Sequence, residues 1–188
     1  MAATMRVVKR VGLEGVTIRE IAAEAGFSTG VLSHYFTNKA DILVAAHHAA
    51  FGQVIDRIDA LRSVASDPVD LMSRALAEAL PLDRARLLEA QIDVSFWGLS
   101  LRDPMLRSVR EQSYDEGVAA WLELIEEIID TGRAQAGADA AAIARETVAL
   151  IDGISIQAVL FPDKMTADVQ ERAIAHHVAS FTTANSDG

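Results

Sequence analysis

Residues 17–36, TIREIAAEAGFSTGVLSHYF, decide the fold, because they contain the start, the end and the connecting turn of two short helices. Thr17 and Glu20 form a T-x-x-E capping box, which places a helix start at Thr17. Gly26 allows the positive φ that ends a helix, and Ser28 caps the next helix two residues later. The stretch therefore predicts a helix-turn-helix.

The second helix of this motif has an apolar side and a polar side. Leu32 and Phe36 anchor it from below, while Thr29, Gly30, Ser33 and His34 form the opposite face. A recognition helix enters the major groove of DNA with its N-terminal residues first, so this polar face is expected to meet base edges. An ordinary solvated helix surface is the alternative, and His34 could equally pack against the protein.

Two basic residues flank the motif. Arg19 lies near the start of the first helix, and arginine pairs bidentately with guanine O6 and N7. Lys39 follows an Asn38-x-x-Asp41 cap at the start of the next helix, where a phosphate would satisfy both the cation and the helix amides. We expect Arg19 to read sequence and Lys39 to hold phosphate.

Charge is distributed unevenly along the chain. The formal net charge is −10, from 17 basic and 27 acidic residues. Residues 1–46 hold five basic and four acidic residues, a balance of +1, so the remainder carries −11. Such an asymmetry is expected when only the N-terminal part must approach a polyanion.

Composition excludes several classes of protein. Apolar residues make up 51% of the 188 residues, enough for a real core, and the absence of cysteine excludes disulfide scaffolds, thiolate zinc sites and cysteine nucleophiles. No apolar run approaches the ~18–20 residues that span a bilayer, and the N-terminus lacks a signal-peptide core. These features predict a cytoplasmic protein with no membrane association.

The remainder of the chain reads as helix, with apolar residues at three- and four-residue steps. We expect an all-α fold of about nine helices, with a DNA-binding domain over 1–46 and a second domain over 47–188. Expected helices cover 40–64, 71–80, 84–101, one opened by Asp103-Pro104, 140–161 and 165–181, and residues 182–188 are expected to fray. The last two long helices look like the most buried pair. The helix over 140–161 is apolar nearly all round, which predicts either a partner subunit or the centre of a monomeric bundle.

The motif and its surroundings resemble a known family. Residues 15–26, GVTIREIAAEAG, followed by 28–36, STGVLSHYF, Lys39 and Leu43, resemble the N-terminal signature of the TetR family of bacterial transcriptional regulators. Ser33 stands where that family usually has tyrosine. The Ser-His-Tyr-Phe version is similar to the branch of choline-responsive BetI-like repressors, and residues 152–157 with Phe161-Pro162 resemble the C-terminal domain of that branch. The chain begins about one helix before the motif, so the basic arm of many relatives is expected to be short or missing.

The resemblance implies an all-helical homodimer that represses transcription from a palindromic operator and is released by a small-molecule effector. The three N-terminal helices would bind DNA, the remaining helices would form a ligand pocket, and the last two long helices would form the dimer interface. Together with the motif, it implies contacts to double-stranded DNA from a set of polar residues: Thr17, Arg19, Ser28, Thr29, Gly30, Ser33, His34, Tyr35 and Lys39.

Candidate ligand residues lie where acids and aromatics share a helix face. Asp93 precedes Phe96 and Trp97 by three and four residues, and Trp121 opens the apolar stripe of a later helix. An acid beside aromatic rings suits a cationic effector. A solvated or ion-paired Asp93 beside core aromatics is the alternative, and Gln157, Gln91 and Asp152 are weaker candidates. Effector binding is expected to tilt the long helix that starts at Ala40 and so weaken DNA binding.

The sequence leaves two alternative functions, a metal-dependent enzyme and a protein-interaction module. A metal-dependent enzyme would need Glu-x-x-His pairs, which do not occur, and the adjacent pairs His47-His48 and His176-His177 point to different sides of a helix. No Gly-rich phosphate loop or nucleophile elbow appears either. We therefore expect no enzyme activity, no metal and no cofactor. A dimeric interaction protein whose motif no longer reads DNA is the second rival.

Overall fold

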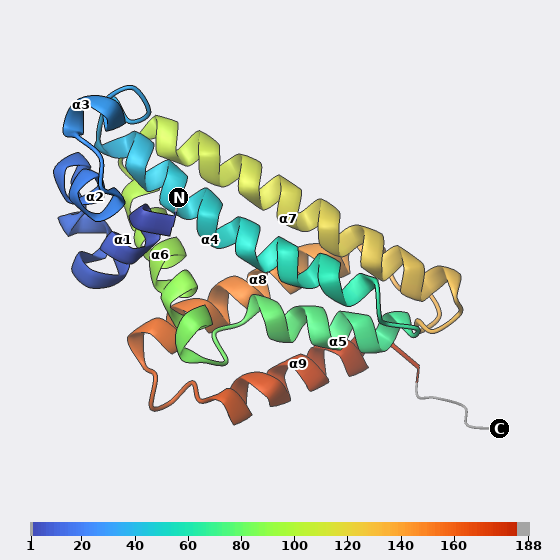
Figure 1. Cartoon of the computed structure of the whole chain (residues 1–188). Helices are drawn as coiled ribbons and strands as arrows, with labels where there is room; N and C mark the ends of the chain where they lie inside the picture. The colour runs from blue at the N-terminus through green and yellow to red at the C-terminus, as the bar shows by residue number, and fades with distance from the viewer. Residues whose placement is uncertain (1, 184–188) are drawn as a thin grey trace.

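The computed structural model describes residues 2–183 and consists of helices joined by short connections (Figure 1). The elements are α1 (Ala2–Gly15), α2 (Ile18–Ala25), α3 (Thr29–Leu32), α4 (Lys39–Arg62), α5 (Pro68–Ala79), α6 (Arg84–Ser100), α7 (Pro104–Asp130), α8 (Ala140–Leu160) and α9 (Ala167–Phe181). The described residues form no strand, only an isolated bridge between Ala134 and Thr182. The expected all-α fold of about nine helices is confirmed.

Most helix starts are fixed by side-chain caps that the sequence specifies. The Asn38 side chain accepts a hydrogen bond from the Asp41 amide, and the Asp41 carboxylate accepts one from the Asn38 amide, which is a complete capping box. Asp67 and Asp103 cap helices that have proline in the first turn. At Thr17 the box is incomplete, because Thr17 accepts from the Glu20 amide while its own hydroxyl donates to the Glu20 carboxylate.

The first three helices pack into a head at one end of the molecule (Figure 1). Gly26 takes a left-handed conformation with φ 72° and ends α2, as its position predicts. The recognition helix α3 is shorter than the sequence suggested: it ends at Leu32 and continues as turns through residues 33–35. Leu32 is buried and Phe36 half-buried, so the expected anchoring is confirmed.

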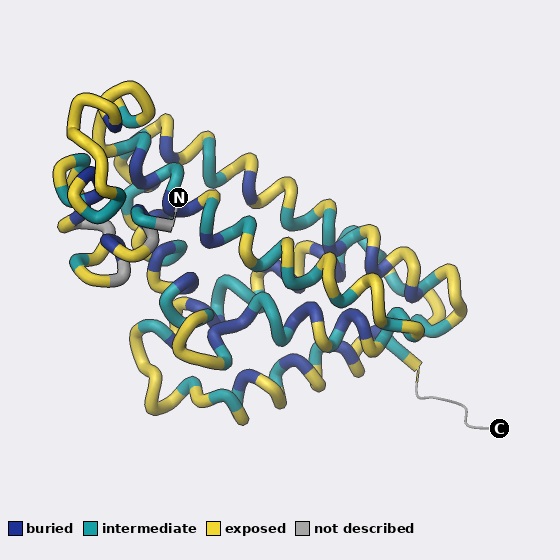
Figure 2. The backbone as a smooth tube through the Cα atoms, in the orientation of Figure 1, coloured by how far each residue is buried: buried dark blue, intermediate teal, exposed yellow. Residues whose placement is uncertain are grey.

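The body is built around two long helices, α4 and α7, that run from the head toward the opposite end (Figure 1). Helix α8 packs on α7 and α6, and α5 packs between α4 and α9. The deepest side chains of the body, each at most 1% exposed, all lie outside α9 and come from α4 to α8 and the end of α5: Ile42, Ala46, Ala50, Met72, Ala75, Leu76, Leu80, Ile92, Phe96, Leu124, Ile125, Ile128, Ala144 and Thr147. The expectation that 140–161 and 165–181 are the most buried pair is therefore wrong, because α9 contributes none of these side chains and both α8 and α9 keep an exposed face (Figure 2).

Two apolar clusters hold the chain together. One joins α5, α7, α8 and α9, and the other joins the head to α4, α6 and the start of α7. The second cluster includes Ile92, Phe96 and Leu106, which lie far beyond residue 46 in sequence. The head thus packs on the body through shared core, and the division of the chain at residue 46 stays a prediction.

The C-terminal segment is anchored for as far as the structure describes it. Thr183 donates its amide to the Arg133 carbonyl at 2.8 Å, and Gln135 donates to the Phe181 carbonyl at 2.8 Å. The expectation of fraying from residue 182 is therefore wrong for Thr182 and Thr183, because backbone bonds pair them with the α7–α8 connection. Residues 184–188 lie outside the described range.

Candidate functional site

The residues expected to contact DNA are all exposed on the head. All nine residues are exposed: Thr17, Arg19, Ser28, Thr29, Gly30, Ser33, His34, Tyr35 and Lys39. The alternative that His34 packs into the protein does not apply in this structure, because its side chain is exposed. The turn before α3, most of α3 and the turns that follow it are exposed, whereas α2 is exposed only at single positions (Figure 2).

Within this surface the hydroxyl groups have specific local partners. Ser28 caps α3 by accepting from the Val31 amide at 3.4 Å. The Ser33 hydroxyl donates to the Thr29 carbonyl at 2.8 Å, one helical turn back. Ser33 therefore offers DNA only the acceptor side of its oxygen, whereas its own proton is used inside the helix.

Three apolar or aromatic residues extend the same surface, and sequence reasoning missed two of them. Phe27 is 59% exposed, Val31 42% and Tyr35 74%. Phe27 lies in the turn and Val31 in α3, between residues already assigned to DNA contact. Phe27 and Val31 could have been recognised in the sequence as large apolar residues at positions that do not share the buried side of Leu32. Such side chains can contact thymine methyl groups or the sugar edge in a major groove.

The start of α4 differs from the expected phosphate site. The Asp41 carboxylate accepts from the Thr37 hydroxyl at 2.6 Å and from the amides of Thr37 and Asn38. The Thr37 bonds, with that of Asn38, hold the pKa of Asp41 below its usual range, so it is ionised at neutral pH. The amides of Thr37, Asn38 and Asp41 are already bonded within the protein. The expected phosphate contact would therefore have to use the Lys39 side chain and not those amides.

A cavity lies inside the body between α4, α6, α7 and α8. Its volume is about 220 Å³, and the wall mixes aliphatic side chains with acids, bases and aromatic rings. Its charged or aromatic members are Phe51, Asp59, Arg62, Arg86, Glu89, Asp93, Trp97, Arg110, Tyr114, Trp121, Glu123 and Asp152, with His47 at the end nearest the head. Five carboxylates face three guanidinium groups, so the wall has an excess of negative charge.

The expected ligand residues divide into two groups. Asp93, Trp97 and Trp121 line the cavity, and so does the weaker candidate Asp152. Phe96 does not line it: the ring is fully buried in the cluster that holds the head. Gln157 is exposed on α8, outside the cavity, because it faces away from α6 and α7. The spacing of four residues from Asp93 correctly predicted that Trp97 lines the same wall. Phe96, three residues from Asp93, points into the core instead.

His47 connects the cavity to the helix that enters the head. It lies on α4, where only 3% of its side chain is exposed. Its Nδ1 is 2.8 Å from Asp93 Oδ1 on α6, and its Nε2 is 3.0 Å from the Ser113 hydroxyl on α7. One imidazole therefore bonds three helices together. The sequence signal for this role was weak, since in the sequence His47 stands out only as one of two adjacent histidines.

The order Ser113, His47 and Asp93 superficially matches a hydrolytic triad, but the setting does not support catalysis. Ser113 is 5% exposed and sits in the middle of α7. Helix-interior amides donate to carbonyls four residues back, so α7 offers no spare pair of N–H groups to stabilise an oxyanion beside Ser113. The three side chains position helices and line a wall.

A second polar arrangement lines the same cavity. Arg110 Nη2 on α7 is 2.7 Å from Asp152 Oδ2 on α8, and its guanidinium lies 5.0 Å from the Trp97 ring centroid. Burial raises the pKa of Asp152, Arg110 counters that rise, and the Asp93 charge adds to it. Asp93 and Asp152 are therefore two carboxylates that repel each other across this part of the wall.

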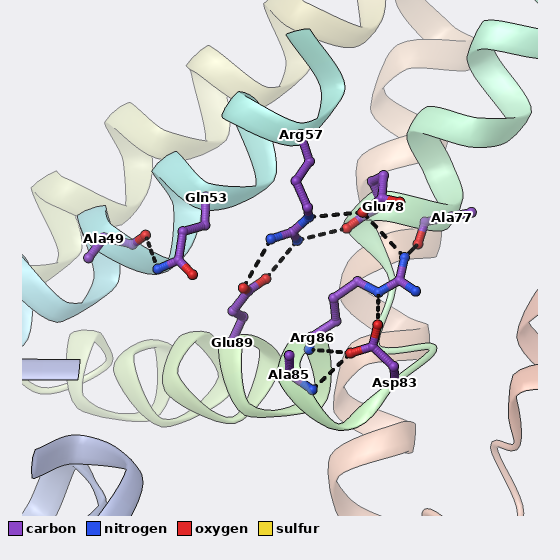
Figure 3. Close-up of polar contacts among 9 residues, drawn as sticks. All are labelled: Ala49, Gln53, Arg57, Ala77, Glu78, Asp83, Ala85, Arg86 and Glu89. Carbon is purple, nitrogen blue, oxygen red and sulfur yellow. Dashed lines mark hydrogen bonds and ion pairs between the residues drawn. The ribbon is translucent and has the colours of Figure 1, made fainter. Parts of the chain in front are cut away.

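Near α5, an ion-pair cluster fixes α4 to α5 and α6 (Figure 3). Arg57 lies between Glu89 at 2.7 Å and Glu78 at 2.9 Å. Arg86 bonds Asp83 at 2.9 Å and approaches Glu78 at 3.4 Å. Hydrogen bonding to Glu89 raises the pKa of Arg57, so the guanidinium is charged at every accessible pH. The cluster sets where α4 lies relative to the other walls of the cavity.

The structure of residues 2–183 meets neither the requirements of a metal site nor those of a membrane span. That part of the chain contains no group of three or more histidine, aspartate or glutamate side chains arranged to hold a metal ion. No helix within it is both long enough and apolar enough to cross a bilayer.

Two family models match nearly the whole chain. The model described as bacterial regulatory proteins of the tetR family matches residues 1–46. The model described as the C-terminal part of BetI-type transcriptional repressors matches residues 68–183. The matched families are families of transcriptional regulators and not of enzymes.

Individual relatives agree with these matches. The chain is 29% identical to the HTH-type transcriptional regulator PksA of Bacillus subtilis (strain 168), covering 95% of this chain and 85% of that one. It is 28% identical to BetI 2 of Chromohalobacter salexigens, covering 93% and 82%. A putative transcriptional regulator from Saccharomonospora viridis in complex with choline has the same fold, with a TM-score of 0.84 at 23% identity over 97% of this chain and 95% of that one. The chain belongs to the TetR family of bacterial transcriptional regulators, in its BetI-like branch.

Proposed function

We propose that the protein is a repressor that binds a palindromic operator as a homodimer and is released by a cationic small-molecule effector. The observation that carries the proposal is the course of α4. This helix begins at Lys39, directly behind the recognition surface, and places His47, Phe51 and Ile58 in the cavity wall. An event in the cavity therefore acts on the same rigid element that positions the head.

The DNA-binding part of the proposal rests on the exposed surface of α2 and α3. Arg19 is our candidate for reading guanine, and Thr29, Gly30 and Ser33 for meeting base edges. Gly30 has only Ser28 Oγ near the position of an added Cβ, at 3.7 Å, so a close approach to DNA explains glycine here better than crowding within the protein. Binding to chromosomal DNA implies that the protein acts in the cytoplasm.

The homodimer rests on exposed apolar residues near the end of α8. Ile156 is 37% exposed and Leu160 59%, on the face of α8 that a second copy would cover. The exposed side of α9, which includes Glu171 and His176, is mostly polar. A two-fold pairing through α8 and α9 would bury the apolar positions and set two recognition helices about 34–36 Å apart, one turn of DNA.

The cationic class of effector rests on the chemistry of the cavity wall. Asp93 and Asp152 supply negative charge, while Trp97, Tyr114 and Trp121 supply aromatic faces. Carboxylates beside aromatic rings attract weakly hydrated cations by charge and by cation–π contact. The fold relative in complex with choline, which carries a quaternary ammonium group, supports the same class for this chain.

Coupling between the two sites is proposed to run through His47. A cation that draws the Asp93 carboxylate toward itself weakens the Asp93–His47 bond and so loosens α4 from α6. Because binding free energies are linked, effector must weaken DNA binding by the same factor by which DNA weakens effector binding.

The test is a fluorescence-anisotropy titration against DNA from upstream of the protein's own gene, at two salt concentrations. We expect saturable, salt-sensitive binding that scrambled DNA does not reproduce and that Arg19→Ala weakens at least tenfold. Arg84→Ala is the matched control, because Arg84 is exposed on α6 in the body. Equal affinity for scrambled DNA would contradict the proposal and favour an interaction protein with an inactive head. Specific binding that Arg19→Ala leaves unchanged would contradict the role of Arg19 in reading the operator.

A further inference from the structure

The guanidinium of Arg110 already occupies the part of the cavity that best suits a cation. It makes an ion pair with Asp152 at 2.7 Å and lies over two aromatic rings, 5.0 Å from the centroid of Trp97 and 5.9 Å from that of Tyr114. All four side chains line the same cavity. A carboxylate with two aromatic faces is the arrangement that recognises quaternary ammonium ligands.

We propose that Arg110 is an internal competitor at the effector site, which an incoming cation must displace from Asp152 and Trp97, and that it thereby sets the specificity of the site. This inference rests on the proposed cationic effector. The guanidinium satisfies the recognition groups while the site is empty, so the site is neither collapsed nor left with a bare carboxylate.

Arg110 does not exhaust the negative charge of the site. Asp152 keeps a raised pKa even with Arg110 beside it, because burial costs the carboxylate more than the ion pair returns. Asp93 lies close enough to add to that rise, and its own hydrogen-bond partner is His47 and not Arg110. A ligand cation is therefore attracted to the same wall. Its binding is most favourable where it replaces the Arg110 guanidinium beside Asp152.

The competition predicts which cations succeed. A tethered guanidinium lowers the apparent affinity of every ligand by the fraction of time that the site is open. A primary ammonium is strongly hydrated and must give up water before it reaches the aromatic faces, whereas a quaternary ammonium is weakly hydrated and loses little. Arg110 thus lowers the apparent affinity for all cations, and quaternary ammonium ions are the ones that still bind, because they lose the least hydration free energy.

The experiment is an isothermal calorimetric titration of tetramethylammonium chloride into the full-length protein. The variants are Arg110→Gln, Arg110→Lys, Asp152→Asn and the double variant Arg110→Gln/Asp152→Asn. Arg74→Gln is the matched control, because Arg74 pairs with Asp70 at 3.4 Å on the surface of α5, outside the cavity. Circular dichroism and thermal unfolding establish that each variant is folded.

We expect Arg110→Gln to bind tetramethylammonium about tenfold more tightly than wild type, Arg110→Lys about threefold more tightly, and Arg74→Gln within twofold of wild type. In the Asp152→Asn background the Arg110→Gln change should alter affinity less than twofold, since the guanidinium has already lost its anchor there.

The outcomes separate this inference from the proposed function. Wild-type binding that Arg110→Gln leaves unchanged overturns the competitor role and leaves the cationic effector standing. A tenfold gain that persists in the Asp152→Asn background also overturns it, because removal of one positive charge anywhere nearby would then suffice. Binding by neither wild type nor Arg110→Gln removes the cationic effector, and the competitor role with it.

Discussion

The ring of His47 stacks on the ring of Phe96, with 4.3 Å between the centroids and 6° between the planes. His47 lines the cavity, whereas Phe96 belongs to the apolar cluster that includes the buried residues of the head. The contact is thus a direct link between the wall that would meet an effector and the core on which the head rests. It also gives Phe96 a role other than the ligand contact that the sequence suggested.

This link makes His47 a residue whose replacement should act on both functions. We expect His47→Leu to weaken operator binding at least about threefold in the absence of ligand and to lose most of the further release by tetramethylammonium, because the leucine fills the space but cannot bond Asp93 and Ser113, so α4 is already loosened from α6. The measurement is operator anisotropy with and without ligand. His48→Leu is the control, since His48 is exposed on the same helix. Operator affinity and release by tetramethylammonium equal to those of wild type in His47→Leu would show that coupling takes another route.

Arg57 and Glu89 should behave as a stabilising pair at the side of the cavity. Glu89 is 8% exposed, so Arg57→Met leaves a nearly buried carboxylate without its main cation and should lower the free energy of unfolding by about 2–3 kcal/mol. The double variant Arg57→Met/Glu89→Gln should recover more than half of that loss, because no unpaired charge remains. Urea unfolding measures both values. Arg74→Gln, which breaks an exposed pair, should cost less than about 0.5 kcal/mol.

Stability should decline with acidification through His177. Its ring nitrogen is 2.8 Å from the Thr147 hydroxyl between α8 and α9, and burial lowers the pKa of His177, with Glu146 acting in the opposite direction. The folded state therefore prefers the neutral imidazole. Its contribution is complete above the ordinary histidine value of about 6.5 and is lost as the pH falls toward the lowered pKa of the folded state.

The measurement for His177 is the difference in unfolding free energy between wild type and His177→Gln from pH 7.5 to 5. That difference should shrink as the pH falls below about 6.5. Asp152 acts in the opposite direction, because a carboxyl whose pKa is raised on folding favours the native state as the pH falls through that raised value. The comparison with His177→Gln cancels the Asp152 contribution. A pH-independent difference would exclude His177 as the source.

Gly26 should be costly to replace, because it ends α2 in a left-handed conformation. Its φ is 72°, and nothing lies within 4 Å of an added Cβ, so Gly26→Ala tests backbone strain alone. We expect a loss of about 1–2 kcal/mol in unfolding free energy, measured by urea unfolding. Gly98→Ala is the control: Gly98 lies inside α6 with open space around it, and alanine should stabilise that helix by about 0.5–1 kcal/mol.

The sequence predicted those parts of the fold that local chemistry decides. The caps at Thr17, Ser28 and Asn38 and the break at Gly26 act within a few residues, so helix boundaries there follow from the chain itself. The all-α class followed from helical periodicity. The length of α3 did not, because whether residues 33–35 continue the helix depends on how Phe36 packs in three dimensions.

The cavity was only partly predictable, for a related reason. Asp93 and Trp97 share a face of one helix, so their proximity was visible in the spacing. Arg110 and His47 come from other helices, and their meeting with Asp152 and Asp93 depends on the order in which α4, α6, α7 and α8 pack. Periodicity gives the face of each helix but not its neighbour, which is why Phe96 and Gln157 were misplaced.

The length of α4 gives small motions in the body a mechanical advantage at the head. The helix has 24 residues, and at 1.5 Å per residue its axis measures about 36 Å. If it pivots about the Arg62 end, a rotation of about 5° moves His47 by about 2 Å and Lys39 by about 3 Å. A displacement that breaks one hydrogen bond at His47 is thus about one and a half times as large at Lys39, next to the helix-turn-helix. In a two-fold dimer, opposite displacements of that size change the separation of the heads by about 6 Å, a mismatch that an operator with a spacing of about 34 Å cannot absorb without bending.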